Sequence, residues 1–343
     1  LCDYRNYEVA DVNLSPGLTV ITGNNGGGKT NLLEAMGYLS TLASFRGAPN
    51  EALVRAGSQR AVLRGSGERS GRSVLVEAEI TSAGRSRATL NRQSVRRSSD
   101  LLEAVLVTVF SPDDLELVKG APAIRRRYLD DVLASLHPRH DATRRELERI
   151  LKQRTALLRQ IAASGVGQTR LGRDEAGTLA VWDTKLVEVG EVVGQARADL
   201  VDQLRPLATM FYRRLATIPG SDSAEKEGGP AMPEKMHLNL SYEAPWRASG
   251  LVAALVSVRH EEIRRGSCLV GPHRDDLGVT LDGLPGRTHA SQGEQRCVAL
   301  AMRLAAHQLV TDRLGEAPLL LLDDVFSELD ANRSRALVGC LPP

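Results

Sequence analysis

A glycine-rich segment near the start of the chain has the residue types and spacing of a loop that binds nucleotide phosphates. It fits G-x-x-x-x-G-K-[ST] at every fixed position and comprises Gly23, Asn24, Asn25, Gly26, Gly27, Gly28, Lys29 and Thr30. Glycines let backbone amides curl around a β-phosphate, because no Cβ stands in the way. Lys29 can then reach the β- and γ-phosphates, and the Thr30 hydroxyl can coordinate Mg²⁺. The segment predicts a site for a nucleoside triphosphate with Mg²⁺.

Two carboxylates follow an apolar run far along the chain. The run is Leu319–Leu322, and Asp323 and Asp324 come directly after it. Beside bound phosphates, we expect Asp323 to hold Mg²⁺ through water and Asp324 to orient or deprotonate the attacking water. Acidic residues are common at strand ends, so this interpretation depends on the phosphate loop in the same chain.

A third segment, Ala290–Gln295, lies between these two motifs and opens a helical pattern. The Ser291 hydroxyl and the exposed amides near Gly293 make an anion site at a helix start. The same residues also make an ordinary helix cap, which is the stronger interpretation of the segment taken alone. Its position between the other two motifs favours the anion site.

The elements that must position these residues follow from hydrophobic periodicity. Leu18–Thr22 has a strand pattern, and the apolar residues from Thr30 to Leu42 have helical spacing. Strand, glycine-rich loop and helix form the context that a phosphate loop requires. The remaining pattern predicts charged helices at residues 124–159 and 179–215, followed by a polar linker at 219–233. After the linker it predicts a strand at 236–242, a helix at 249–265 and a strand at 277–281. A long helix from residue 291, a buried strand at 319–322 and a last helix from residue 330 complete the predicted elements.

The three motifs resemble those of ABC-type ATPases, and further segments are similar to the RecF family within the SMC-like group. Residues 290–295 resemble the signature motif, usually written LSGGQ or LSGGE, and Ser327–Asp330 resembles the D-loop. The segments similar to the RecF family are Tyr4–Tyr7, Phe110–Leu115, Arg125–Asp130, Gly271–Leu277 and Leu320–Asp330. The most distinctive of these reads G-P-H-R-D-D-L, and together the segments span nearly the whole chain.

The resemblance implies a protein that binds ATP with Mg²⁺ and forms an ATP-dependent homodimer, in which Ser291 acts in trans on the partner's nucleotide. RecF-like proteins associate with double-stranded DNA beside single-stranded gaps, work with RecR and RecO, and help to load RecA. Hydrolysis is expected to be slow and stimulated by DNA. Asp324 stands where most relatives have Glu, and its shorter side chain predicts modest turnover.

The resemblance also implies a fold. We expect a mixed α/β ABC-type P-loop ATPase core, formed by residues 1–112 plus 236–343. Residues 113–235 are expected to form an inserted helical subdomain and linker, a short arm without a long coiled coil, because sustained heptads are missing. Arg5 and Asn6 are candidates for the adenine pocket by resemblance only. The switch histidine of ABC proteins is expected beyond Pro343, and His273 is expected to be structural.

Arginine clusters are the candidates for contact with DNA phosphates. They are Arg85, Arg87, Arg92, Arg96 and Arg97, then Arg125, Arg126 and Arg127, then Arg144 and Arg145. Aromatic residues make up only 3% of the chain, so a platform that stacks single-stranded bases is poorly supported. For each cluster the alternative is a solvated or salt-bridged face, because acidic residues such as Glu146 and Glu148 lie close by in the sequence.

Composition excludes several classes of protein. The 343 residues have a net charge of +2, which neither requires nor excludes nucleic acid. The four cysteines are scattered without a C-x-x-C pair, so neither a disulfide framework nor a zinc site is expected. The apolar run near residue 320 is too short to span a bilayer, and a cytoplasmic protein is expected. Another SMC-like ABC ATPase acting on DNA stays open as an alternative; a P-loop phosphotransferase, a transporter subunit and a nuclease are less favoured.

Overall fold

The computed structural model describes residues 1–95, 97, 99–102, 104–163, 172–216, 237–327 and 329–341. These residues form two compact units. The first unit comprises residues 1–115, 211–216 and 299–341, and the second comprises residues 116–210 and 237–298. The linker predicted at 219–233 lies outside the described residues. Within the described ranges, no helix is both long and apolar enough to cross a membrane.

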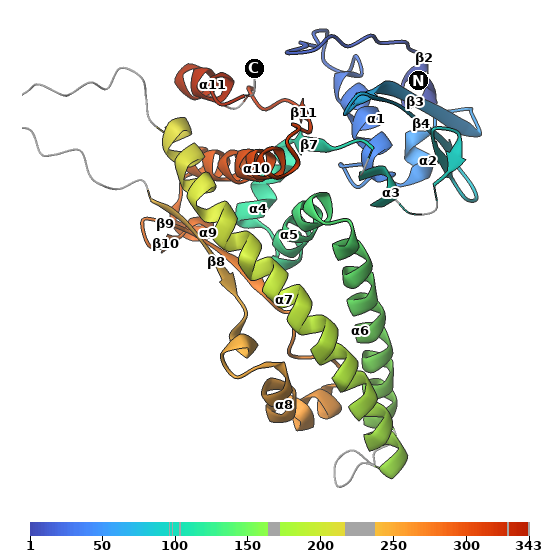
Figure 1. Ribbon diagram of the computed structural model, residues 1–343. Helices are drawn as coiled ribbons and strands as arrows, with labels where there is room; N and C mark the ends of the chain where they lie inside the picture. The colour runs from blue at the N-terminus through green and yellow to red at the C-terminus, as the bar shows by residue number, and fades with distance from the viewer. Residues whose placement is uncertain are drawn as a thin grey trace, which may run out of the picture. The chain divides into compact units, whose positions relative to one another are not determined.

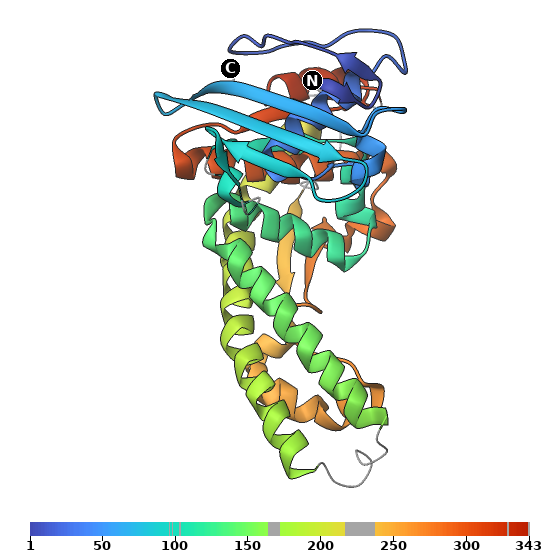
Figure 2. The same cartoon turned by 90° about the vertical axis from the view of Figure 1, so that its right-hand side faces the viewer.

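The first unit contains a six-stranded sheet in which every pairing is antiparallel. Its order is β2 (Tyr7–Val9), β1 (Cys2–Tyr4), β3 (Arg60–Arg69), β4 (Arg72–Thr81), β5 (Arg87–Leu90) and β6 (Gln93–Ser94). Alternation along β4 buries Val76, Ala78 and Ile80 on one face and leaves Glu77 and Glu79 on the other. The buried face packs against α1 (Lys29–Thr41), α2 (Asn50–Leu53) and α3 (Ser99–Leu102), and Figure 2 shows the long β3–β4 hairpin of this sheet in pale blue.

A separate pair of parallel strands carries the acidic motif. β11 (Leu319–Leu322) pairs with β7 (Val107–Phe110), with Leu321 opposite Val109. The strand predicted at 319–322 is confirmed, but the expectation that it is buried throughout was wrong, because Leu319 is 44% exposed and only Leu321 is buried. The helix predicted at 30–42 is confirmed as α1. The long helix predicted from residue 291 is confirmed as α10 (Gln292–Leu314), and the last helix as α11 (Ala331–Val338).

The strand predicted just before the phosphate loop was wrong. Residues 18–22 are irregular, and the Leu18 and Val20 side chains are 73% and 72% exposed. A strand is stabilised by hydrogen bonds to a neighbour, and within the described chain the backbone of residues 18–22 forms none to another strand. The β-branched residues of this segment prefer an extended conformation, but no neighbouring strand pairs with them in the described chain.

The second unit is a helical arm with a small sheet. Figure 1 shows α6 (Arg139–Ala163) and α7 (Arg173–Ala216) lying side by side, with α8 (Leu251–Arg265) beside them. Their apolar faces meet through Leu147, Ile150, Leu158, Ile161, Leu179, Leu186, Val193, Leu251, Leu255 and Ile263. α5 (Pro122–Leu136) precedes α6, and the antiparallel sheet has the order β10 (Leu284–Pro285), β9 (Asp276–Leu281), β8 (Leu238–Glu243). The helices predicted at 179–215 and 249–265 and the strand at 277–281 are confirmed, as is the strand predicted from residue 236 over its described part. The stretch predicted at 124–159 is helical but consists of two helices, α5 and α6, with a break after Leu136.

Residues 237–298 belong to the same compact unit as residues 116–210. The division of the chain into an ATPase core of residues 1–112 plus 236–343 and an insertion of residues 113–235 stays a prediction, because a core defined by a shared fold need not coincide with a compact unit.

Candidate functional site

The phosphate loop has the backbone shape that its glycines were expected to allow. Gly26 and Gly28 have φ angles of +79° and +99°, a region that residues with a Cβ rarely adopt. The Gly27 amide donates to the Asn24 carbonyl at 3.1 Å, which closes a turn within the loop. α1 begins directly afterwards, at Lys29, and no side chain caps its first amides. These amides are therefore available to an anion at the positive end of the helix.

The two residues predicted to bind metal lie next to each other. The Thr30 hydroxyl donates to Asp323 Oδ1 at 2.7 Å, although 293 positions separate the residues in the chain. The Asp323 amide donates to the Phe110 carbonyl at 2.9 Å, which fixes the end of β11. Burial raises the pKa of Asp323, and the hydrogen bond from Thr30 opposes that shift. A hydroxyl and a carboxylate held together in this way are oxygen donors of the kind that Mg²⁺ takes.

Lys29 and Asp324 complete the predicted site. The Lys29 ammonium donates to the carbonyls of Gly23 and Asn24 at 2.9 and 3.0 Å, which places it against the loop that it belongs to. Asp324 is exposed and has a φ angle of +53°, a conformation that Asp tolerates better than most residues. Its carbonyl accepts a hydrogen bond from the Ser327 hydroxyl at 3.0 Å. The carboxylate therefore lies at the surface, one residue from the buried Asp323.

Sequence reasoning missed the contacts that hold the phosphate loop from the side. Asn6, in the turn between β1 and β2, donates from Nδ2 to the Gly27 carbonyl at 3.4 Å and accepts from Asn31 Nδ2 at 2.8 Å. The Tyr7 hydroxyl donates to the Gly28 carbonyl at 3.1 Å. An ideal Cβ on Gly28 would lie 2.6 Å from Asn6 Nδ2, so the loop and the turn fit only with glycine at this position. The motif gave no signal for this contact, because its partners precede it by some twenty residues.

Arg5, one of the two residues proposed for the adenine pocket, forms hydrogen bonds within the protein. Arg5 Nε and Nη2 each donate to the fully buried Glu34 at 2.8 Å, and Nη1 donates to the Ala52 carbonyl at 2.9 Å. Ser44 also donates to Glu34, at 2.5 Å. Burial opposes ionisation of Glu34, but the hydrogen bonds from Arg5 and Ser44 outweigh it and lower the Glu34 pKa. Arg5 thus anchors the turn that carries Asn6, and the Glu34 carboxylate balances its positive charge.

Arg46 is a second residue that the sequence motifs did not single out. Its charge acts to lower the pKa of both Asp323 and Glu34. One guanidinium nitrogen lies 3.5 Å from Asn31 Oδ1, next to the phosphate loop. Arg46 follows the helix that the loop opens and matches no motif, so only the structure identifies it as a cation close to the acidic end of the site.

The signature segment is the start of a capped helix. The Ser291 amide donates to Glu294 Oε2 at 2.7 Å, and the Glu294 amide donates to the Ser291 hydroxyl at 3.3 Å. This reciprocal pair is a capping box, so the interpretation as a helix cap is confirmed. Gln295 is buried and donates to the carbonyls of Gly286 and Arg287, which ties the helix start to α9 (Gly286–His289). Ser291 itself is exposed, and Gly293 follows in the first turn.

The D-loop segment ends in a second cap. Asp330 Oδ1 accepts from the amides of Asn332 and Arg333 at 3.0 and 2.9 Å, at the start of α11. The hydrogen bonds to these amides lower the Asp330 pKa. Asp330 is therefore the N-cap that its sequence position indicated.

Most of one arginine cluster forms contacts within the protein, which is the salt-bridged alternative to a DNA surface. Arg125 is 8% exposed and forms a bidentate ion pair with Asp276, at 2.8 and 2.7 Å. Arg126 donates to the carbonyl of Asp275 at 2.7 Å. Only Arg127 of this run is largely exposed. The sequence could not separate these residues, because the acidic partners lie about 150 positions away.

Arg144 and Arg145 belong to a salt-bridged face, which is the alternative to DNA contact that the sequence left open. Arg144 pairs with Asp141 and Glu148, and Arg145 pairs with Asp141, all within one face of α6. Of the first cluster, Arg96 lies outside the described residues, and the other members are exposed.

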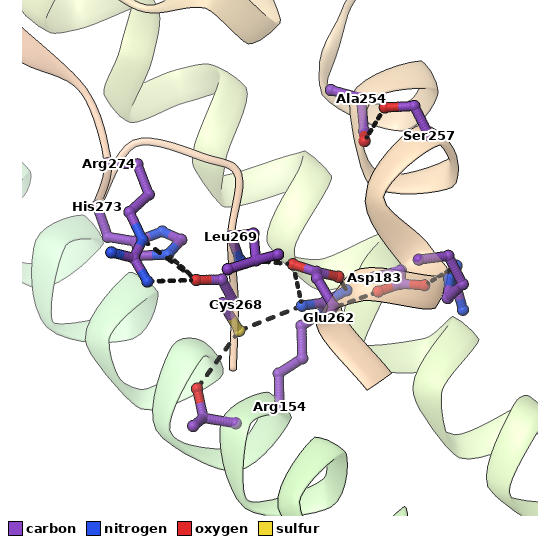
Figure 3. A network of polar contacts seen from close by, with 11 residues as sticks. Arg154, Asp183, Ala254, Ser257, Glu262, Cys268, Leu269, His273 and Arg274 are labelled. Carbon is purple, nitrogen blue, oxygen red and sulfur yellow. Dashed lines mark hydrogen bonds and ion pairs between the residues drawn. The ribbon is translucent and has the colours of Figure 1, made fainter. Parts of the chain in front are cut away.

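The G-P-H-R-D-D segment joins several elements of the second unit. Figure 3 shows His273 Nε2 and the Arg274 guanidinium both at the Cys268 carbonyl, at 3.2 and 2.8 Å. Burial lowers the His273 pKa to about 4, so this side chain is neutral at pH 7. Asp275 accepts from the Tyr242 hydroxyl at 2.5 Å and from Trp246 Nε1 at 2.7 Å. The segment therefore has a structural role, as expected for His273.

Comparison with known proteins covers the whole chain. The family model described as the RecF/RecN/SMC N terminal domain matches residues 1–342. A "DNA replication and repair protein RecF" from Kineococcus radiotolerans is 43% identical, over 98% of this chain and 87% of that protein. A protein of the same name from Acidothermus cellulolyticus is 42% identical, over 99% of this chain and 89% of that protein.

Solved structures agree with the sequence relatives. Two structures of the recombination mediator protein RecF in the RecFOR pathway, one with ATP and one with ATPrS, each match with a TM-score of 0.82 and 26% identity. Each match covers 98% of this chain, and 88% and 87% of the ATP and ATPrS chains respectively.

Proposed function

The chain belongs to the RecF family of DNA replication and repair proteins, and from that premise we propose that it is an ATP-gated clamp on duplex DNA beside single-stranded gaps. The observation that supports this most directly is the Thr30–Asp323 contact, because it joins the phosphate loop to the acidic strand end in one site. In this proposal the loop residues 23–30 hold the phosphates, and Thr30 and Asp323 hold Mg²⁺. The metal would neutralise phosphate charge.

Hydrolysis in this proposal is slow. Lys29 stabilises charge on the β- and γ-phosphates, and Asp324 positions the attacking water. The family is an ATPase family, but an Asp carboxylate reaches one methylene less far than Glu, so we expect turnover below about 1 per second. Phosphate release measured with and without duplex DNA checks this rate. Asp324→Asn keeps the side-chain shape, and we expect it to lower turnover by about 100-fold or more while ATP affinity stays unchanged. Turnover of tens per second in the unaltered protein would contradict the proposal.

The dimer is the second part of the proposal. By resemblance, Ser291 and Gly293 at the start of α10 contact the γ-phosphate held by the partner subunit. The exposed, capped helix start supports this, because its amides can receive an anion. We further infer that the protein works in the cytoplasm with RecO and RecR, upstream of RecA, since the solved relatives belong to the RecFOR pathway.

The gating mechanism is tested by duplex-DNA binding, measured by fluorescence anisotropy with and without ATP. Ser291→Asp retains a good N-cap, so the fold of α10 should persist. Its carboxylate would repel the partner's γ-phosphate, and we expect ATP-dependent binding to be lost. Ser249→Asp adds the same charge at another exposed serine and should bind normally. Binding that does not respond to ATP, in the unaltered protein, would exclude the clamp mechanism.

A further inference from the structure

Positive charge is concentrated in one stretch of the chain. Residues 60–97, which form β3 to β6 and the segment after β6, contain nine arginines, three glutamates and no lysine or aspartate. This stretch has a net charge of +6, and because the whole chain carries +2, the remaining residues carry −4. Charge segregation of this kind creates a local field that attracts a polyanion, even though the total charge is small.

Part of this charge is neutralised by carboxylates within the first unit. Arg64 lies 2.7 Å from Glu77, Arg69 lies 3.1 Å from Glu316, and Arg60 lies 3.6 Å from Glu79. Five further arginines are exposed, and none of them forms an ion pair with a described residue: Arg72, Arg85, Arg87, Arg92 and Arg97. We call these five the edge arginines: Arg72 begins β4 directly after the β3–β4 turn, Arg87 begins β5, and Arg85, Arg92 and Arg97 lie outside the strands.

The edge arginines are held on a rigid frame. β4 pairs with β3 along its whole length, and β5 pairs with β4 from Val76↔Leu90 to Glu79↔Arg87. The distance along β4 from Arg72 to the level of Arg87 is about 24 Å, at about 3.4 Å per residue. Successive phosphates of one DNA strand rise by about 3.4 Å along the helix axis, so a frame of this length matches about seven base pairs of a duplex that lies along it.

Arg92 lies at a turn position whose backbone conformation favours glycine. Asn91 and Arg92 form the two-residue turn between β5 and β6, with φ angles of +49° and +68°. The corresponding turn between β3 and β4 has the same backbone form and uses Ser70 and Gly71. Asn91 accepts from the Leu75 amide at 2.8 Å and so fixes the turn to β4. An arginine kept in a strained conformation on a fixed turn points to a role outside the fold.

From these observations we propose that the edge arginines are the surface of this protein that contacts the phosphates of duplex DNA. The inference rests on the proposed function and specifies where the DNA lies. Residues 60–97 contain no aromatic residue, so the surface cannot stack unpaired bases and fits the sequence-independent backbone of a duplex. The internally paired Arg125 and the bridged Arg144 are excluded from this surface.

The experiment measures duplex affinity by fluorescence anisotropy at several salt concentrations, with ATP and Mg²⁺ present. Arg92→Gly removes one charge and relieves the turn. We expect a melting temperature that is unchanged or higher, an affinity several-fold lower, and a slope of log K against log salt that is smaller by about 1. A second variant, which combines Arg72→Gln, Arg85→Gln, Arg87→Gln and Arg92→Gly, should reduce the slope by about 4. Arg144→Gln removes a charge that is already paired and should leave the slope unchanged.

The possible outcomes distinguish a failure of the proposed DNA surface from a failure of the proposed function. Duplex binding by the unaltered protein together with an unchanged slope in the fourfold variant overturns the surface and leaves the proposed function standing. A fourfold variant that aggregates but binds duplex normally has the same meaning, because charge would then serve only to protect the sheet edge. Failure of the unaltered protein to bind duplex overturns both. Unchanged ATP affinity in all variants is expected, since none of the changes touches the phosphate loop.

Discussion

Replacing Arg154 by alanine is expected to lower the free energy of unfolding by about 3–5 kcal/mol, because it leaves the buried Glu262 carboxylate without its cation. Arg154 is 0% exposed on α6 and is the centre of the network in Figure 3. Its guanidinium donates to Asp183 of α7 at 2.8 Å and to both oxygens of Glu262 of α8, at 3.0 and 2.5 Å. It also donates to the Cys268 sulfur at 3.2 Å. One side chain thus connects three helices of the arm.

The balance of charge explains why this network tolerates burial. Burial opposes the Arg154 charge, but the hydrogen bonds and charge of Glu262, with Asp183, outweigh it and raise the Arg154 pKa. Asp183 has a second cation in Arg259, whereas Glu262, which is also fully buried, depends on Arg154 for its charge balance. Loss of Arg154 therefore leaves Glu262 as the main unpaired charge.

Urea unfolding of three variants tests this account of Arg154. Arg149→Ala, on the same helix, breaks an exposed pair with Glu146 and should change stability little. Combining Arg154→Met with Glu262→Gln removes the cation and the carboxylate together, and we expect it to recover part of the loss seen in Arg154→Ala. If Arg154→Ala destabilises the protein no more than Arg149→Ala does, the network does not hold the arm together.

The sequence was sufficient for the parts of the site that are local. A phosphate loop is defined by residues 23–30 alone, and its strand-end partner by an apolar run with two acids, so both could be identified without knowing how the chain folds. The Thr30–Asp323 contact then confirmed that the two segments meet. Capping at Ser291 and Asp330 was likewise local, because a cap involves only residues two or three positions ahead.

Long-range partners explain what the sequence could not predict. Arg125 and the edge arginines have the same side chain and similar neighbours in sequence, and only Asp276, 151 positions away, distinguishes a buried cation from a free one. The strand predicted at Leu18–Thr22 failed for a related reason, because strand preference is local but pairing is not. The contacts of Asn6 and Tyr7 with the phosphate loop join a hairpin turn to a helix start, and no pattern of residue types signals such a contact.

Replacing Gly28 by alanine is expected to weaken ATP binding by about 10- to 100-fold, because two separate costs fall on the same residue. The φ angle of +99° strains any residue with a Cβ. The new Cβ would also lie 2.6 and 2.7 Å from the Asn6 side chain and 3.0 Å from the Tyr7 hydroxyl, too close for these side chains to keep their positions. Since Asn6 and Tyr7 hold the carbonyls of Gly27 and Gly28, the amides of the loop should lose their alignment toward the phosphates.

Three further variants separate the cost of backbone strain from the cost of the clash. Gly84→Ala has nearly the same strain, at φ +96°, but its Cβ meets nothing within 4 Å, so ATP affinity should be unchanged and only stability should fall slightly. Asn6→Ala alone removes the hydrogen bond to the Gly27 carbonyl without adding a Cβ to the loop. Because most of the clash is then gone, adding Gly28→Ala to Asn6→Ala should weaken ATP binding by a smaller factor than Gly28→Ala does in the unaltered protein. The measurement is equilibrium binding of a fluorescent ATP analogue. Full affinity in Gly28→Ala alone would mean that the β1–β2 turn can move away freely, and that its contacts do not shape the nucleotide site. If Gly28→Ala weakens ATP binding by the same factor with Asn6 and with Ala at position 6, the effect comes from backbone strain within the loop.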